Sequence, residues 1–329
     1  MSIISVKNLK KYYLVHQKEP GLIGSVKSLI HRKYIDVKAV DGISFEIKEG
    51  ELVGFIGPNG AGKTTTLKVL SGLLYPTSGE VKVLGYEPFK RQTEFQKQFT
   101  IIMGQKNQLW WDLPAVESFI LNKEIYEVSD DQFNRVVKEL SKMLGVEDVL
   151  KIQVRKLSLG QRMKCELIAA LIHSPKVLFL DEPTIGLDVV AQKAMRDFIK
   201  NYNEKFNATI ILTSHYMSDV KELCKRIIII NEGKILYDGL LEKIVKRYAP
   251  YKVIKADFDP STGSGQVERE KLESIGKVKE FDGFHVKIQI TKSLVAERAA
   301  KLLSEFKVAD LTIEDPAIED IIREVFTKA

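Results

Sequence analysis

Apolar positions along this chain follow two spacings in turn, and the alternation predicts an α/β fold. Short apolar runs typical of buried strands are separated by stretches with helical spacing, from about residue 3 to residue 239. This order favours a largely parallel sheet with crossover helices. The predicted strands lie at residues 43–47, 52–56, 177–180, 210–213 and 226–230, and residues 234–237 pair back across a turn at 231–233.

Residues from about 106 to 160 have a different pattern. Apolar positions at residues 115–126 and 130–144 recur at helical spacing, and the stretch offers no strand candidate. We therefore expect a mostly helical subdomain inserted in the α/β domain.

The pattern changes again after Gly239. Residues 240–248 predict a helix, and Pro250 marks a boundary. The elements beyond it follow the order β-α-β-β-α-β, typical of a ferredoxin-like split unit, before a last helix opened by Pro316. We expect a domain over residues 1–240, a linker helix at 241–250 and a small α+β domain over 251–329.

One loop carries the clearest chemistry. It fits G-x-x-x-x-G-K-[ST] and lies between a predicted strand and a predicted helix, which is the context of a phosphate-binding loop. Its glycines let backbone N–H groups approach phosphate oxygens, Lys63 would reach the β- and γ-phosphates, and Thr64 would bind Mg²⁺. The candidate phosphate-binding residues are Gly57, Asn59, Gly60, Gly62, Lys63, Thr64 and Thr65.

Two further segments narrow the function. Asp181 and Glu182 end an apolar strand, where Asp181 would hold Mg²⁺ through water and Glu182 would take a proton from an attacking water. Ser158 and Gly160 stand where a helix begins, a second place suited to phosphate. One nucleotide does not need two γ-phosphate sites, so the sequence predicts a symmetric dimer in which each chain closes over the other's nucleotide.

With these motifs, residues 1 to about 240 resemble the nucleotide-binding subunits of ATP-binding cassette (ABC) transporters, most closely the ATPases of bacterial ABC-2-type exporters. The resemblance implies ATP and Mg²⁺ as cofactors, a second copy or a closely related ATPase as dimer partner, and separate membrane permeases. It also implies roles for further residues: Gln105 as the glutamine that senses Mg²⁺ and the γ-phosphate, Gln161 in the signature at 157–161, Asp188 in the D-loop, His215 as the γ-phosphate switch, and Tyr13, or else Tyr12, as the ring on adenine.

The chain departs from the family pattern in three places. Leu159 replaces a signature glycine, and would either narrow the approach to a partner's phosphate or pack on the helical subdomain. Pro114 replaces a common threonine near the Trp110-Trp111 pair, which suits either a permease surface or the core. Residues 17–36 form an insertion with apolar residues at helical spacing, predicting a basic amphipathic helix that docks on permease or membrane, or packs on the cassette.

Composition and charge indicate where in the cell the chain acts. The longest apolar runs are about five residues, against roughly 18 to 20 for a membrane span, and no secretion signal is seen. The net charge of +6 lies within residues 1–38. Cys165 and Cys224 have no metal-ligand spacing, consistent with free thiols in a reducing compartment. We therefore expect a peripheral protein on the cytoplasmic face of the membrane.

Alternative functions remain at this stage. A polysaccharide exporter's ATPase can also carry an insertion near residues 17–36. A soluble ABC ATPase acting on ribosomes or DNA is a different class, but one cassette, and a C-terminal domain without a basic stripe of aromatics, disfavour it. No nucleic-acid partner is expected.

Overall fold

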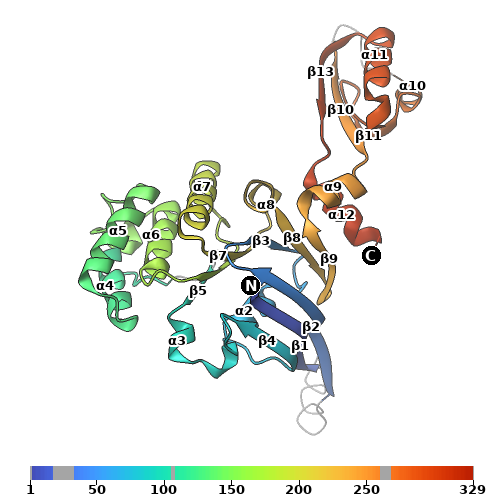
Figure 1. Cartoon of the computed structure of the whole chain (residues 1–329). Helices are drawn as coiled ribbons and strands as arrows, with labels where there is room; N and C mark the ends of the chain where they lie inside the picture. Colours follow the sequence, from blue (N-terminus) through green and yellow to red (C-terminus); the bar gives the residue numbers. More distant parts are fainter. Residues whose placement is uncertain (1, 18–32, 105–107, 260–267, 329) are drawn as a thin grey trace, which may run out of the picture. The chain divides into compact units, whose positions relative to one another are not determined.

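The computed structural model describes residues 2–17, 33–104, 108–259 and 268–328, which fold as two compact units, Met1–Gly239 and Leu240–Ala329. In the first unit (Figure 1), the strands of a six-stranded sheet lie in the order β5-β6-β7-β3-β8-β9. Neighbouring strands from β5 to β8 pair in parallel, as the alternating pattern predicts. Their bounds are β5 Phe99–Met103, β6 Val177–Asp181, β7 Thr209–Thr213, β3 Leu52–Ile56, β8 Arg226–Asn231 and β9 Lys234–Leu240.

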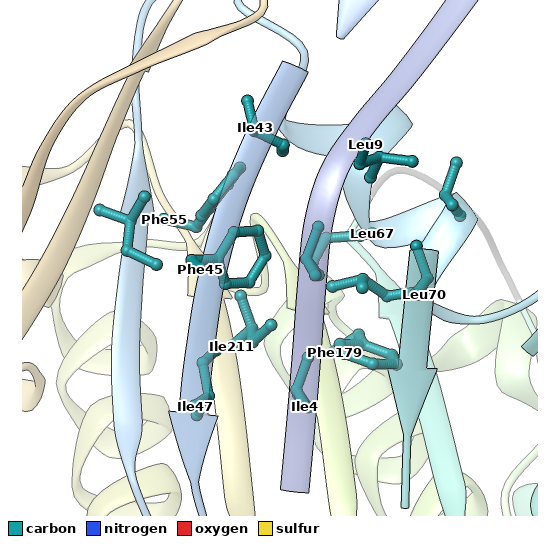
Figure 2. Close-up of a cluster of buried hydrophobic side chains, with 14 of the residues drawn as sticks. Ile4, Leu9, Ile43, Phe45, Ile47, Phe55, Leu67, Leu70, Phe179 and Ile211 are labelled. Carbon is teal, nitrogen blue, oxygen red and sulfur yellow. The ribbon is translucent and has the colours of Figure 1, made fainter. Parts of the chain in front are cut away.

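A second sheet of the first unit has three antiparallel strands in the order β2-β1-β4. Figure 2 shows the core between the two sheets, where Ile4 and Phe45 of this sheet pack near Phe55, Phe179 and the helix that follows β3. Burial of these side chains fixes the start of that helix relative to the sheet. The bounds are β1 Ser2–Gln17, β2 Lys33–Lys48, β4 Ser78–Val83 and α2 Lys63–Leu70.

The helical subdomain predicted at about residues 106–160 contains two helices that match the predicted spacing within one residue, α4 Ala115–Ile125 and α5 Asp130–Leu144. Both pack on α6 (Leu159–Leu171), and Figure 1 shows the three grouped beyond β5. Ser129 caps α5, because its side chain accepts the Gln132 backbone N–H. The remaining helices are α3 Thr93–Gln96, α7 Val189–Phe206 and α8 Met217–Leu223, with 3₁₀ turns at Pro88–Lys90 and Val154–Lys156.

The insertion at residues 17–36 differs from its prediction where it is described. Gln17 pairs with Lys33, and residues 33–36 continue β2 in an antiparallel hairpin with β1, so this part is strand and not helix. Cross-strand packing of Val15 opposite Ile35 favours the extended form here. The helical positions themselves, residues 22–30, lie outside the described residues.

The second unit contains the predicted β-α-β-β-α-β order. Its sheet order is β11-β12-β10-β13, with every neighbouring pair antiparallel, and an apolar core that includes Ile254, Leu272 and Leu302 lies on one face. The first helix of this order is short, at Arg269–Glu273. The bounds are α9 Leu241–Tyr248, β10 Tyr251–Phe258, α10 Arg269–Glu273, β11 Lys277–Phe281, β12 His285–Thr291, a 3₁₀ turn at Lys292–Leu294, α11 Val295–Glu305, β13 Val308–Glu314 and α12 Ile318–Lys328.

Candidate functional site

The candidate phosphate loop joins β3 to α2, as the sequence predicts. Gly57 has no room for a side chain, because a Cβ there would lie 2.1 Å from the Ile230 carbonyl oxygen. Gly62 has φ +105°, and a Cβ would lie 2.3 Å from the Ala39 oxygen. Asn59 and Gly60 are exposed at the outer bend, and Thr65 is half-buried in the first turn of α2. The backbone therefore takes a tight bend that only glycine permits.

Lys63 is buried at the base of this loop. Its Nζ donates to the carbonyl oxygens of Gly57 at 2.6 Å and Pro58 at 3.0 Å. Burial lowers the pKa of Lys63, while the nearby carboxylates of Glu182 and Asp181 oppose that shift. A positive charge is thus held beneath the loop, beside two acids.

Asp181 joins this loop to a neighbouring strand. Its Oδ2 accepts a 2.8 Å hydrogen bond from Thr64 Oγ1, and its Oδ1 accepts one of 2.6 Å from Thr213 Oγ1. Thr213 lies opposite Asp181 in the β6–β7 register, a role that sequence reasoning missed. A hydroxyl beside a carboxylate is an oxygen ligand set that fits Mg²⁺ together with phosphate and water. No group of three or more His, Cys, Asp or Glu side chains within the described ranges could hold a metal alone.

Glu182 and His215 meet directly, with 2.7 Å between Glu182 Oε1 and His215 Nε2. Glu182 has φ +56°, a conformation that costs a non-glycine residue roughly 1–3 kcal/mol and is concentrated at functional sites. Its backbone N–H donates to the carbonyl and hydroxyl oxygens of Thr213, each at 3.1 Å. Gly104 approaches closely, since a Cβ there would lie 2.2 Å from the Glu182 oxygen. Gln105, which follows it, lies outside the described residues.

A buried network behind this site was also missed. Asp219 is fully buried, and its Oδ2 accepts hydrogen bonds from Thr184 Oγ1 at 2.6 Å and Ser214 Oγ at 2.7 Å. Its Oδ1 accepts one from Arg196 at 3.1 Å. Because Thr184 follows Glu182 and Ser214 precedes His215, one carboxylate holds both segments of the site. In the sequence, the position of Ser214 directly before the predicted switch histidine was the one indication of this network.

The second candidate phosphate segment forms a separate cluster. Ser158 and Gln161 form a capping box at the start of α6, and Asp188 caps α7 by accepting the Ala191 backbone N–H. Leu159 lies against the D-loop, since a Cβ at Gly186 would lie 3.3 Å from its Cδ2. A Cβ at Gly160 would lie 3.2 Å from the Ala191 Cβ, so these two helix starts pack together.

The sequence left open the roles of two aromatic pairs, Tyr12-Tyr13 and Trp110-Trp111. Tyr12 donates its hydroxyl hydrogen to Asp41, and this hydrogen bond raises the pKa of Tyr12 and lowers the pKa of Asp41. Tyr13 is half-buried, and Lys11 Nζ lies 5.1 Å from the centre of its ring. Trp110 and Trp111 are 53% and 48% exposed, so the core alternative for this pair is wrong.

Comparison with known proteins places this geometry in a family. Residues 40–185 match the ABC transporter model, and residues 250–314 match the EvrA-like ABC transporter C-terminal domain. The chain is 35% identical to the ABC transporter ATP-binding protein NatA of Bacillus subtilis over 63% of this chain and 84% of NatA. It is 30% identical to the linearmycin resistance ATP-binding protein LnrL of the same organism, over 88% and 94%.

A solved ATP-binding subunit of an ABC transporter superposes with a TM-score of 0.63 at 25% identity, covering 75% of this chain and 93% of that one. No helix among the described residues is long and apolar enough to span a membrane. ATP-binding subunits of this kind dimerise and act with membrane permeases. The chain belongs to the ABC transporter family, as an ATP-binding subunit whose ATP hydrolysis is coupled to transport.

Proposed function

We propose that this chain drives an ABC-2-type exporter as a peripheral subunit on the cytoplasmic face of the membrane, with its permease on a separate chain. Residues 1–240 are the ATPase domain, with the helical subdomain at about 106–160. A linker helix at 241–250 leads to an accessory domain at 251–329. The single observation that carries the chemistry is the Asp181 carboxylate bridging Thr64 and Thr213, with Glu182 and His215 in contact beside it.

Each residue then has a role that its position supports. The bend from Gly57 to Gly62 presents backbone N–H groups to phosphate, and Lys63 beneath it supplies positive charge. Thr64 and Asp181, with Gln105, would hold Mg²⁺, which neutralises phosphate charge when bound. Glu182 accepts a proton from water, and His215 orients that carboxylate toward the γ-phosphate. Tyr13, whose hydroxyl is not held by Asp41 as that of Tyr12 is, stacks on adenine.

The second cluster belongs to the partner's nucleotide. Ser158, Gly160, Gln161 and Asp188 lie at the starts of α6 and α7. The side chains of Ser158 and Gln161 cap the start of α6, and the side chain of Asp188 caps the start of α7. Two exposed apolar residues follow Asp188: Val189 and Val190, at 78% and 80%. Such a surface suits burial against a second copy or a closely related ATPase, arranged head to tail.

The permease surface includes the tryptophan pair. The Arg155 backbone N–H donates to the Trp111 oxygen, which places the exposed tryptophans beside the similarly exposed Ile152 region. The Arg162 guanidinium lies 5.4 Å from the Trp111 ring centre, which ties this surface to the signature helix α6. Trp and Arg are typical of the central residues of protein interfaces.

Replacing Glu182 by Gln tests the chemistry. The amide keeps the shape but cannot accept the proton, so ATP turnover should fall by about 10² or more while ATP binding persists. Glu147→Gln, at an exposed position in the helical subdomain, is the matched control and should keep its turnover. Near-normal turnover in Glu182→Gln would remove Glu182 from this role.

The transport assignment needs a separate test. The Glu182→Gln chain, trapped with ATP, is purified from detergent-solubilised native membranes and its companions are identified by mass spectrometry. A multi-span membrane protein in stoichiometric amount is the expected result. Recovery of ribosomal or DNA-bound proteins in its place would overturn the exporter assignment.

A further inference from the structure

The outer part of the β1–β2 hairpin exposes an unusual concentration of large apolar side chains. We name residues 14–17 and 33–36 the outer hairpin. Leu14 is 72% exposed, Tyr34 52%, Val15 48% and Ile35 46%. Leu14 and Tyr34 lie on one face of the ribbon, where the polar residues opposite them are Asp36 and His16. Val15 lies opposite Ile35 on the other face, so each face exposes large apolar side chains.

The outer hairpin has no further strand beside it within the described residues. β4 pairs with β1 only as far as Lys10, and β2 is the edge strand of its sheet (Figure 1). An isolated two-stranded ribbon is at best marginally stable in water. One that exposes large apolar side chains on both faces therefore gains stability from surroundings that contact both.

The two faces and two edges of the outer hairpin indicate which surroundings fit it. A flat protein surface would cover one face of the ribbon, whereas lipid surrounds both. The unpaired backbone groups along both edges exclude the hydrocarbon centre of a bilayer, where they would lack partners. The headgroup region supplies those partners, and a tyrosine such as Tyr34 is favoured at that depth.

Charge selects the kind of lipid. Residues 14–38 hold an excess of positive charge: the basic residues are Lys18, Lys27, Arg32, Lys33 and Lys38, and the acids are Glu19 and Asp36. Lys38 is exposed at the base of the outer hairpin, on β2. This excess of positive charge favours a negatively charged surface.

We propose that the outer hairpin inserts into the headgroup region of an anionic lipid bilayer. This contact attaches the subunit to the membrane in addition to any permease contact. The proposed contact with the bilayer involves neither the nucleotide nor the residues of the ATP site. It can therefore be tested independently of the exporter assignment.

The test uses the purified full chain and protein-free vesicles in a flotation assay. The chain should float with vesicles of phosphatidylcholine and phosphatidylglycerol, much less with phosphatidylcholine alone, and less at high salt. The double variant Leu14→Ser, Ile35→Ser should lower the partition coefficient about tenfold or more. Circular dichroism and ATP turnover, which should both stay normal, show that the variant is folded.

Leu303→Ser with Ile313→Ser is the matched control, because these side chains are 55% and 42% exposed in the second unit. The control should float like the native chain. The proposal is overturned if the native chain stays unbound to anionic vesicles, or if the hairpin variant floats as well as the native chain. It is equally overturned if the control pair lowers flotation as much, or if association requires the permease in the vesicle.

Discussion

Nη1 of Arg196 donates a 3.1 Å hydrogen bond to Oδ1 of Asp219, and both side chains are almost fully buried. This pair joins α7, the helix after the D-loop, to α8, the helix after His215. The other Asp219 oxygen holds Thr184 and Ser214. The buried Asp219 carboxylate thus connects the segments around the ATP site to one another.

Asp219→Ala should therefore destabilise the chain strongly. It leaves the Arg196 guanidinium buried with one fewer partner, at a cost of about 3–5 kcal/mol in the free energy of unfolding. Turnover should fall as well, because the segments bearing Glu182 and His215 lose their common acceptor. Glu222→Gln is the control: Glu222 also bonds Arg196 but is half-exposed, so its loss should cost under about 1 kcal/mol. Equal urea-unfolding midpoints for the two variants would contradict this ranking.

Thr213→Val separates binding from chemistry. Valine keeps the volume but removes the hydroxyl that donates to Asp181 and accepts the Glu182 N–H. We expect ATP affinity within a few-fold of native and turnover reduced roughly tenfold or more, because losing a hydrogen bond to a charged group costs about 1.5–3 kcal/mol. Thr213→Ser restores the hydroxyl and should recover most of the rate. A valine variant with native turnover, measured by phosphate release, would show that this hydroxyl does not position the acids.

Local pattern was enough to predict much of this site. The strand at 52–56 matches β3 residue for residue, and the motif after it predicts the position of Lys63 and Thr64 at the start of α2. The helix predicted to begin at Ser158 to Gly160 starts at Leu159 in the structure. These features depend on residues that are neighbours in sequence.

The features that were missed depend on tertiary contacts. Thr213 lies beside Asp181 only because β6 and β7 are neighbours in the sheet. The residues of a strand do not determine which strand of a parallel sheet lies next to it. The contact of Leu159 with Gly186 likewise joins segments far apart in sequence. In the insertion, helical spacing at residues 22–30 gave no sign that the flanking residues 33–36 would pair with β1.

Glu166 is a buried acid of α6, the helix that begins in the signature segment. It is 1% exposed, and Arg162 Nε is 3.9 Å from Oε1. Burial raises the pKa of Glu166 from 4.5 to about 7, while the Arg162 charge and a hydrogen bond with the Gln108 backbone oppose the rise. The ionised form is therefore disfavoured in the folded chain relative to the unfolded chain.

Glu166→Gln should thus stabilise the chain in a pH-dependent way. The stability associated with a neutral Glu166 is fully present below the unfolded pKa of 4.5 and is lost as the pH rises through the folded pKa of about 7. The variant should gain up to about 3 kcal/mol over the native chain near pH 8, and less than about 1 kcal/mol near pH 5. Urea unfolding at both pH values measures the gain, and Glu117→Gln, at an exposed position of α4, should show no such difference. A gain that is the same at both pH values would mean that Glu166 ionises in the folded chain as readily as in the unfolded one.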